Sequence, residues 1–496
     1  MNLREPLGKV RTKIVATVGP ACRSTEVLCS LIEAGVDVFR LNFSHGDHVE
    51  HSENLKRIRE AADRCGRVVA VLQDLGGPKI RLGDIPGDSV DCKPDDIFTL
   101  VKDRTEAENP YQFTSTYREL ADDLKTDDIV FFADGIVAMI VTRAENGSAT
   151  MRVTLPGRIR SHQGINLPGA ALNVKALTDK DLRDLDWTST NPVEYVGLSF
   201  VRRASDVTHL REELDRRGCP MVKIVAKIEK PQAVADLDAI IVETDAVMVA
   251  RGDLGVEVDV ARVPAIQKQV IAACHQARIP VITATQMLNS MESSSRPTRA
   301  EATDVFNAVL DGTDAVMLSG ETAIGSYPVE AVSTMSRILT EAETLLLGDV
   351  SGTSPWSAFG AKPPTPLQTQ GRGGWVKPIT EGVVEGVRVI GKRLNAALVI
   401  VTTHSGRTAL ALSKQRYAPR TVALAEDAAT AQSMALYWGV NPVLAPGIAE
   451  ANSANAFALK WAKERDLIKP GDYVVIVQGT MPENPGHNAI VVQVVE

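Results

Sequence analysis

Short apolar runs alternate with amphipathic patterns of helical period over residues 13–347, and this alternation constrains the fold more than any other feature. Continuous apolar runs of four to six residues are typical of parallel strands covered on both faces. Such runs occur at 13–18, 36–41, 68–73, 194–199, 221–226, 245–249, 279–283 and 314–318. Eight strands, each followed by a helix, predict an α/β fold built on a (β/α)₈ TIM barrel.

The alternation is interrupted after the third strand. Turns rich in Asp, Gly and Pro separate short strand-like runs there, which predicts a small inserted β-barrel-like domain. A segment rich in Pro and Gly follows the eighth unit, and a new α/β alternation after it predicts a separate C-terminal domain. The expected division is barrel 1–84, insertion 85–164, barrel 165–347, linker 348–378 and C-terminal domain 379–496.

Charge and cysteine content exclude several classes of function. The 54 Lys and Arg against 62 Asp and Glu give a net charge of -8, which disfavours nucleic-acid binding but leaves room for a local basic pocket. The 6 cysteines include no CxxC pair, so neither a disulfide framework nor a zinc site is expected, and a reducing cytoplasm suits them. No apolar leader and no run of about 18 apolar residues is present, so we expect neither secretion nor a membrane partner.

The carboxyl ends of the predicted strands carry candidate ligands for a divalent cation. Glu229 and Asp253 follow neighbouring strands and supply hard oxygen ligands suited to Mg²⁺ or Mn²⁺, with other positions left for substrate and water. Taken alone, each carboxylate is more commonly a salt-bridged rim residue.

Cations at the same ends favour a phosphoryl-transfer site. Four cations, Arg40, Arg81, Lys227 and Arg251, would destabilise the barrel mouth unless a bound anion or carboxylates of the protein balanced their charge. Cations beside a metal site match the spread of negative charge in a phosphoryl-transfer transition state. The simpler interpretation of Lys227 is an ion pair with a neighbouring acid, and from the residues alone both interpretations stay open.

Two other patterns are weaker. His45, His48 and His51 recur at helical spacing without an acidic partner set, which predicts a solvated helix face rather than a metal site. The Gly-Gly-Pro at 76–78 lacks P-loop spacing and predicts a turn that lets backbone approach a ligand.

A series of motifs resembles the pyruvate kinase family. IVAKIEKPQAV at 224–234 has the form of that family's active-site signature. The other landmarks, in chain order, are KIVATVGPAC, FRLNFSHG, DLGGPKIR, GINLPGA, MVARGDLGVE, ITATQMLNSM, RPTRAEATDV and DAVMLSGETA. The resemblance spans about 10–346 and continues more loosely over 380–496, and it implies a barrel with an inserted lid and a C-terminal regulatory domain.

Carried over by position, the resemblance implies transfer of a phosphoryl group from phosphoenolpyruvate to ADP, giving pyruvate and ATP. Lys227 would stabilise the transferring group and the enolate, Arg40 would grip the substrate phosphate, and enolate protonation would occur near Thr285. Glu229 and Asp253 would hold Mg²⁺. The substrate carboxylate would be seated by Thr285 with the backbone at 252–253, that is, Gly252 and Asp253. The nucleotide phosphates would contact Asn42, Phe43, Ser44, His45 and Arg81.

Two departures from the family pattern concern ion and nucleotide binding. The family's K⁺-ligand positions correspond to Asn42, Ser44, Asp74 and Leu75. Lys79 stands where K⁺-dependent members carry glutamate, and Leu75 and Leu82 replace threonines, so K⁺ is expected not to be required and Lys79 to substitute for it. Gln163 replaces a lysine that commonly contacts the nucleotide.

The segment TTHSGRTA at 402–409 resembles the family's effector loop. It would bind a sugar phosphate, or AMP, through Thr402, Thr403, Ser405, Gly406, Arg407 and Thr408, with phosphate at a helix N-terminus. An ordinary helix cap explains the same residues equally well. The resemblance also implies a homotetramer.

Two alternatives remain at this stage. A metal-dependent C–C lyase that forms an enolate on a barrel rim would use the same carboxylate pair, but would not need Arg40, Lys227 and a lid together. A catalytically silent, effector-binding homologue would retain the fold without the chemistry, which the intact Lys227, Glu229, Asp253 and Thr285 disfavour.

Overall fold

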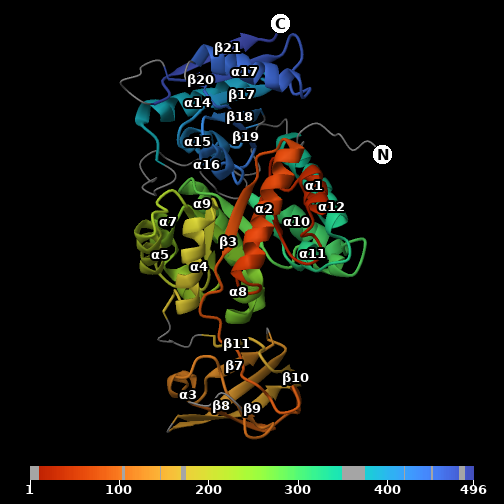
Figure 1. Ribbon diagram of the computed structural model, residues 1–496, viewed down its shortest axis with the longest axis vertical. Helices are drawn as coiled ribbons and strands as arrows, with labels where there is room; N and C mark the ends of the chain where they lie inside the picture. The colour runs from red at the N-terminus through yellow and green to blue at the C-terminus, as the bar shows by residue number, and fades with distance from the viewer. Residues whose placement is uncertain are drawn as a thin grey trace.

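The computed structural model describes residues 10–102, 107–133, 135–145, 147–168, 175–348, 375–417, 419–447, 451–479 and 486–496. They form a barrel in the middle, a β domain at one end and an α/β domain at the opposite end (Figure 1). None of the helices within these ranges combines the length and the hydrophobicity needed to cross a bilayer.

The central domain is a closed, all-parallel eight-stranded barrel, which confirms the predicted fold class. Its strands are β1 (Lys13–Thr17), β2 (Val38–Asn42), β3 (Ala70–Asp74), β12 (Tyr195–Leu198), β13 (Lys223–Ile228), β14 (Ala246–Ala250), β15 (Val281–Ala284) and β16 (Ala315–Leu318). The larger surrounding helices are α1 (Thr25–Ala34), α2 (His48–Cys65), α4 (Asp179–Thr190), α5 (Ala204–Arg216), α7 (Leu237–Glu243), α9 (Val263–Gln276), α10 (Arg299–Asp311) and α12 (Pro328–Gly348). Most strand residues are buried, as expected for strands packed between a barrel interior and a helical layer.

The inserted domain has a six-stranded sheet of order β11-β7-β8-β9-β5-β6 and a two-stranded sheet of order β10-β4. Its strands are β4 (Ser89–Cys92), β5 (Ile97–Val101), β6 (Gln112–Phe113), β7 (Ile129–Phe132), β8 (Val137–Glu145), β9 (Ser148–Leu155), β10 (Gly157–Arg160) and β11 (Ile165–Asn166), with a short helix α3 (Leu120–Asp123). It has its own apolar core, which includes Phe98, Phe113 and Phe132. That core also takes in Ile80 and Ile165, on the two segments that join this domain to the barrel. We call this domain the lid.

The C-terminal domain has a five-stranded sheet of order β19-β18-β17-β20-β21. Its strands are β17 (Leu398–Thr402), β18 (Arg420–Ala425), β19 (Val440–Leu444), β20 (Tyr473–Gln478) and β21 (Ala489–Val494), and its helices are α14 (Pro378–Arg393), α15 (Arg407–Lys414), α16 (Ala428–Ser433) and α17 (Ala451–Lys463). The antiparallel edge strand β21 was not predicted. Most of the predicted linker at 348–378 lies outside the described residues.

The C-terminal domain closes the barrel at the amino ends of its strands. Ala435 and Leu436 belong to the apolar cluster of the barrel interior. Asp314, which precedes β16 and is fully buried, forms ion pairs with Lys414 Nζ at 2.6 Å and Arg416 Nη2 at 2.8 Å. The carboxyl ends of the strands, where barrel enzymes place their active sites, therefore face the lid.

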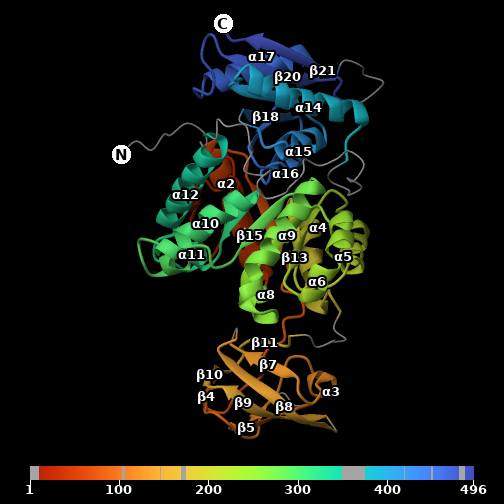
Figure 2. The same ribbon diagram turned by 180° about the vertical axis from the view of Figure 1, so that it is seen from behind.

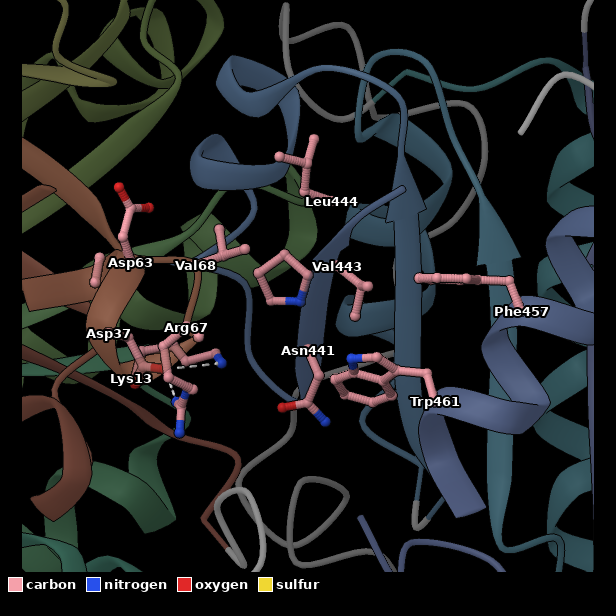
Figure 3. Close-up of a pocket in the computed structure, with 13 residues that line it drawn as sticks. Lys13, Asp37, Asp63, Arg67, Val68, Asn441, Val443, Leu444, Phe457 and Trp461 are labelled. Carbon is pink, nitrogen blue, oxygen red and sulfur yellow. Dashed lines mark hydrogen bonds and ion pairs between the residues drawn. The ribbon is translucent and has the colours of Figure 1, made fainter. Parts of the chain in front are cut away.

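A cleft of about 300 Å³ lies between the barrel and the C-terminal domain (Figure 3). Lys13 and Asp37, which pair at 3.3 Å, line it from the barrel, and Asn441 and Trp461 line it from the other side. Because Lys13 begins β1 and Asp37 precedes β2, this cleft lies at the face of the barrel opposite the site described next.

Candidate active site

Four charged side chains meet at the carboxyl ends of β2, β3 and β13. Arg40 Nε lies 2.7 Å from Asp74 Oδ2, and Arg40 Nη1 donates to Thr17 Oγ1 at 3.1 Å. Lys227 Nζ lies 3.2 Å from Asp74 Oδ1 and 3.0 Å from Glu229 Oε1. Asp74 therefore holds the two cations, Arg40 and Lys227, next to one another from opposite sides of its carboxylate.

Backbone and hydroxyl groups from the end of β12 fix this cluster. Ser199 Oγ accepts a hydrogen bond from Lys227 Nζ at 2.7 Å and donates to the Leu75 carbonyl at 2.7 Å. The Phe200 N–H donates to Glu229 Oε2 at 2.7 Å, from a backbone with φ of 56°. Sequence reasoning missed Ser199 and Phe200, because only the barrel closure brings β12 beside β13.

Burial and neighbouring charges shift the pKa values of three residues in this cluster. Burial favours the neutral amine of Lys227, but the Asp74 and Glu229 carboxylates outweigh it and raise its pKa, so Lys227 is a cation. Burial also opposes ionisation of Asp74, yet Lys227 and Arg40 hold its pKa below the usual range. Burial and the neighbouring Asp253 raise the pKa of Glu229 despite Lys227. Each of the two carboxylates, Glu229 and Asp253, thus has a lysine beside it: Lys227 lies 3.0 Å from Glu229 and Lys79 lies 3.6 Å from Asp253.

This carboxylate pair fits a divalent cation. Glu229 is buried and fixed, whereas Asp253, in helix α8 (Arg251–Glu257), keeps 27% of its side chain exposed. In the described part of the chain, no three His, Cys, Asp or Glu residues gather in a metal-binding arrangement. An ion held by these two carboxylates would keep positions for substrate and water, as Mg²⁺ commonly does. The ammonium of Lys79 lies 3.6 Å from Asp253 Oδ1.

The segment after β15 has a strained backbone. Thr285 and Gln286 have φ of 68° and 53°, a conformation that costs a β-branched residue free energy. Gly252 N–H donates to Thr285 Oγ1 at 2.7 Å, and a Cβ at Gly252 would lie only 3.4 Å from that oxygen. Arg251 Nη2 donates to the Thr285 carbonyl at 2.7 Å. These contacts bring Thr285 and Gly252 together.

The charge of Arg251 is balanced by a carboxylate of the protein itself, one of the two outcomes expected for the cations near the barrel mouth. Its guanidinium pairs with Asp304 at 2.7 Å and also donates to the Ala284 and Thr285 carbonyls. Because its charge and its donors are used inside the protein, Arg251 needs no ligand anion and instead shapes the Thr285 segment.

Aromatic packing against helix α2 fixes the loop that follows β2. The Phe43 ring is buried and stacks on His51 with centroids 4.0 Å apart, so Phe43 faces a ligand only through its backbone. His51 Nε2 hydrogen-bonds the His45 carbonyl at 2.9 Å, and Asn42 Oδ1 accepts from the Ser44 N–H at 3.1 Å. His51 is only 6% exposed, so the prediction of a solvated histidine face is wrong for it.

Positive charge gathers around this loop. Burial, followed by the charges of Arg81, Arg40 and Lys79, lowers the pKa of His45. Arg81 lies on the segment leading into the lid, where its Nη1 donates to the His162 carbonyl at 3.1 Å. In the turn at 76–78, a Cβ at Gly77 would meet the Ser199 Cβ at 2.9 Å. Gly77 is thus required by packing.

The candidate effector loop joins β17 to α15. Gly406 has φ of 73° and its N–H donates to Thr403 Oγ1 at 3.1 Å. His487 Nε2 lies 2.7 Å from the Thr402 carbonyl, so it carries the proton, and Nδ1 then accepts from Thr408 Oγ1 at 2.9 Å. Ser405 and Arg407 are exposed, whereas the hydroxyls of Thr403 and Thr408 are used internally. Sequence reasoning missed His487.

The barrel with its cationic, metal-suited rim defines the class of protein: a phosphotransferase enzyme. The chain belongs to the pyruvate kinase family. Residues 9–332 match the family model described as pyruvate kinase, barrel domain, and residues 381–493 match pyruvate kinase, alpha/beta domain.

Relatives with the same family name cover nearly the full chain. The chain is 41% identical over 475 residues to Pyruvate kinase 2 of Synechocystis sp., covering 95% of this chain and 77% of that protein. It is 38% identical over 473 residues to Pyruvate kinase of Geobacillus stearothermophilus, with 95% and 78% covered. With Pyruvate kinase of Corynebacterium efficiens the identity is 39% over 482 residues, 97% of each chain.

Proposed function

We propose that this chain catalyses phosphoryl transfer from phosphoenolpyruvate to ADP, giving pyruvate and ATP, the last step of glycolysis. The single observation that supports this most strongly is the cluster of Arg40, Asp74, Lys227 and Glu229, with every pair contact at 3.2 Å or less. Two adjacent cations beside a metal-suited carboxylate pair complement charge that develops on a phosphoryl group and on an enolate.

Each side chain has a distinct role in the proposed reaction. Arg40 binds a phosphate oxygen of phosphoenolpyruvate and orients it. Lys227 faces the bridging oxygen and offsets the negative charge that the enolate gains as the P–O bond breaks and the ADP oxygen bonds to phosphorus. Gly252 N–H here donates to the Thr285 hydroxyl, which in turn donates to the Ala284 carbonyl. In the proposed reaction both groups turn to the substrate carboxylate. The enolate carbon is then protonated near Thr285.

Glu229 and Asp253 would hold Mg²⁺ (or Mn²⁺). When bound, the ion supplies charge neutralisation for phosphoryl and enolate oxygens. The interaction of the two carboxylates supports the assignment, because the charge of Asp253, after burial, raises the pKa of Glu229 and a bound cation would relieve that repulsion.

ADP would lie between the loop of Asn42, Phe43, Ser44 and His45 and the lid, with Arg81 against its phosphates. The lid would close over the site and exclude water. Gln163 precedes the Gly164–Arg81 bridge and therefore lies at the mouth of this site. Because Gln163 carries no charge, the affinity for nucleotide would depend on Arg81 more than in relatives that have a lysine at this position.

K⁺ would not be required. Lys79 Nζ, 3.6 Å from Asp253, already supplies a fixed positive charge beside the metal-binding carboxylates. The Leu75 side chain is buried and its carbonyl is occupied by Ser199, and Asp74 is shared between two cations. These contacts leave Asn42 and Ser44 as weak candidates for holding a monovalent ion.

Regulation and assembly belong to the same proposal. A sugar phosphate or AMP would bind the 402–408 loop through the exposed Ser405 and Arg407 and the Gly406 backbone. The chain would assemble as a homotetramer. Association between copies is supported by the edge strand β21, whose Val491, Val492 and Val494 are 39%, 41% and 51% exposed, because proteins rarely leave an apolar edge uncovered. The free thiol state of every cysteine suits a cytoplasmic enzyme.

The test is ADP-dependent pyruvate formation. Purified protein with phosphoenolpyruvate, ADP and Mg²⁺ is coupled to lactate dehydrogenase, and NADH oxidation is followed. The proposal expects oxidation that stops when ADP or Mg²⁺ is omitted. Cleavage of a 2-keto acid without ATP formation would favour the lyase alternative, and effector binding without any turnover would favour the silent homologue.

A further inference from the structure

Helix α8 lies between the candidate metal site and the lid. In both views it is the barrel helix that extends toward the lid, ending near β11 (Figures 1 and 2). Its first turn contributes Gly252 N–H and the Asp253 carboxylate to the site. Its last residue is Glu257, so one helix of 7 residues has the active site at one end and Glu257 at the other.

Glu257 is a buried carboxylate with two partners from different parts of the protein. Its side chain is 1% exposed, and its Oε1 lies 2.6 Å from Lys230 Nζ. The Asn166 amide donates to the same oxygen at 3.4 Å. Lys230 directly follows Glu229, the other candidate metal ligand, and Asn166 lies in β11, which pairs with β7 in the lid sheet.

The lid approaches the same turn of α8 at a second place. Gly135, in the turn between β7 and β8, has φ of 90°, and a Cβ built there would lie 3.8 Å from Val256. The lid therefore contacts the end of α8 through β11 and lies close to it at this turn. An unpaired buried carboxylate is costly, so a lid movement that disturbs Asn166 and Lys230 acts directly on Glu257.

We propose that Glu257 is a positioning residue that joins the lid to the metal-binding carboxylates. It reaches Glu229 through Lys230 and Asp253 through α8. This inference rests on the proposed function of Glu229 and Asp253. With a rise of about 1.5 Å per residue, the helix separates Asp253 from Glu257 by only about 6 Å, so a shift at one end moves the other. Lid closure over nucleotide and the geometry of the metal site are thereby coupled.

The central test is Glu257→Gln, which keeps the shape of the side chain but removes its charge. Loss of a residue that orients metal ligands typically weakens metal affinity or activity about 10–100-fold. We expect Mn²⁺ binding to the substrate-free enzyme, followed by electron paramagnetic resonance, to weaken by about 10-fold. We also expect kcat to fall by a similar factor while the KM for phosphoenolpyruvate changes little. Amide hydrogen exchange at 164–167 in the metal-free protein should accelerate.

Two further variants separate positioning from stability. Asn166→Ala removes only the lid contact, so exchange at 164–167 should accelerate and the KM for ADP should rise while Mn²⁺ affinity stays unchanged. In the variant that carries both Glu257→Gln and Asn166→Ala, exchange at 164–167 should be no faster than in Glu257→Gln alone, because both changes break the same Asn166–Glu257 contact. Glu243→Gln, at the last residue of α7, is the matched control and should leave every measurement unchanged.

Three results would overturn the inference: wild-type Mn²⁺ affinity in Glu257→Gln, a loss of kcat that only follows a loss of folded protein in thermal unfolding, or additive effects on exchange at 164–167 in the variant that carries both changes. A wild-type protein that makes no pyruvate would count against the proposed function instead. The Mn²⁺ and exchange measurements would still decide the role of Glu257.

Discussion

Replacing Lys227 with Met separates its catalytic role from a purely ion-pairing one. The ammonium lies 3.2 Å from Asp74 and 3.0 Å from Glu229, and its side chain is 11% exposed. Met preserves much of the apolar stem, so the change removes mainly the charge and its hydrogen bond to Ser199.

Removal of one preorganised electrostatic group in a water-excluded site costs about 2.7–4 kcal/mol of transition-state stabilisation, or about 10²–10³ in kcat. The binding of a metal ion should change in the opposite direction. Lys227 offsets the charge of Glu229, so its loss should tighten Mn²⁺ binding to the substrate-free enzyme. Phosphoenolpyruvate binding should persist through Arg40.

The measurements are coupled turnover, Mn²⁺ titration and thermal unfolding. Lys268→Met is the matched control, because Lys268 lies in α9 outside the cluster and its half-exposed side chain pairs with a buried carboxylate, Asp311. Breaking a buried ion pair costs about 3–5 kcal/mol of stability, so kcat is normalised to folded protein. Turnover within about tenfold of wild type, the factor that about 1.4 kcal/mol represents, would refute the assigned role and leave Lys227 as a structural ion pair.

Three other changes test neighbouring parts of the account. Ser199→Ala removes the acceptor that fixes Lys227, so kcat should fall about 10–100-fold, as expected for about 1.5–3 kcal/mol from a hydrogen bond to a charged group; an unchanged kcat in the coupled assay would contradict this. Lys79→Glu removes the fixed cation near Asp253, so KCl should stimulate the activity of this variant. If KCl still has no effect, Lys79 does not take the place of K⁺. Asp314→Asn should lower the melting temperature, since breaking such a buried pair costs about 3–5 kcal/mol. The pKa of Asp314 in the folded state is lowered despite burial. Wild type should therefore be more stable than Asp314→Asn above about pH 4, and this difference in stability should disappear as the pH falls through the folded-state pKa.

Apolar patterning predicted the barrel well because its parallel strands are buried on both faces. The runs at 13–18 and 314–318, for example, match β1 and β16, which pair and close the barrel. Patterning was weaker where tertiary contacts decide the structure. Between β13 and β14, for example, the chain forms two short helices rather than one, α6 (Pro231–Ala235) and α7, which separate at Asp236.

The motifs predicted the individual residues of the candidate site, but not the ion pairs and hydrogen bonds between them. Asp74 was known only as an ion-ligand position, whereas the structure places it between Arg40 and Lys227. Nothing in the spacing of Ser199 pointed to Lys227, 28 residues away in the chain. Arg251 directly follows a strand, and its sequence position therefore resembles that of the other cations near the barrel mouth. Only the structure shows that its charge is balanced by Asp304.

The most direct measurement is the rate of pyruvate formation from phosphoenolpyruvate and ADP with Mg²⁺ in K⁺-free Tris buffer, repeated with KCl. The account predicts full activity without K⁺ and no stimulation by KCl, because Lys79 provides the fixed charge beside Asp253. Activity that appears only with KCl would contradict the role of Lys79. No pyruvate in either buffer, even with sugar phosphates or AMP added, would contradict the proposed reaction itself.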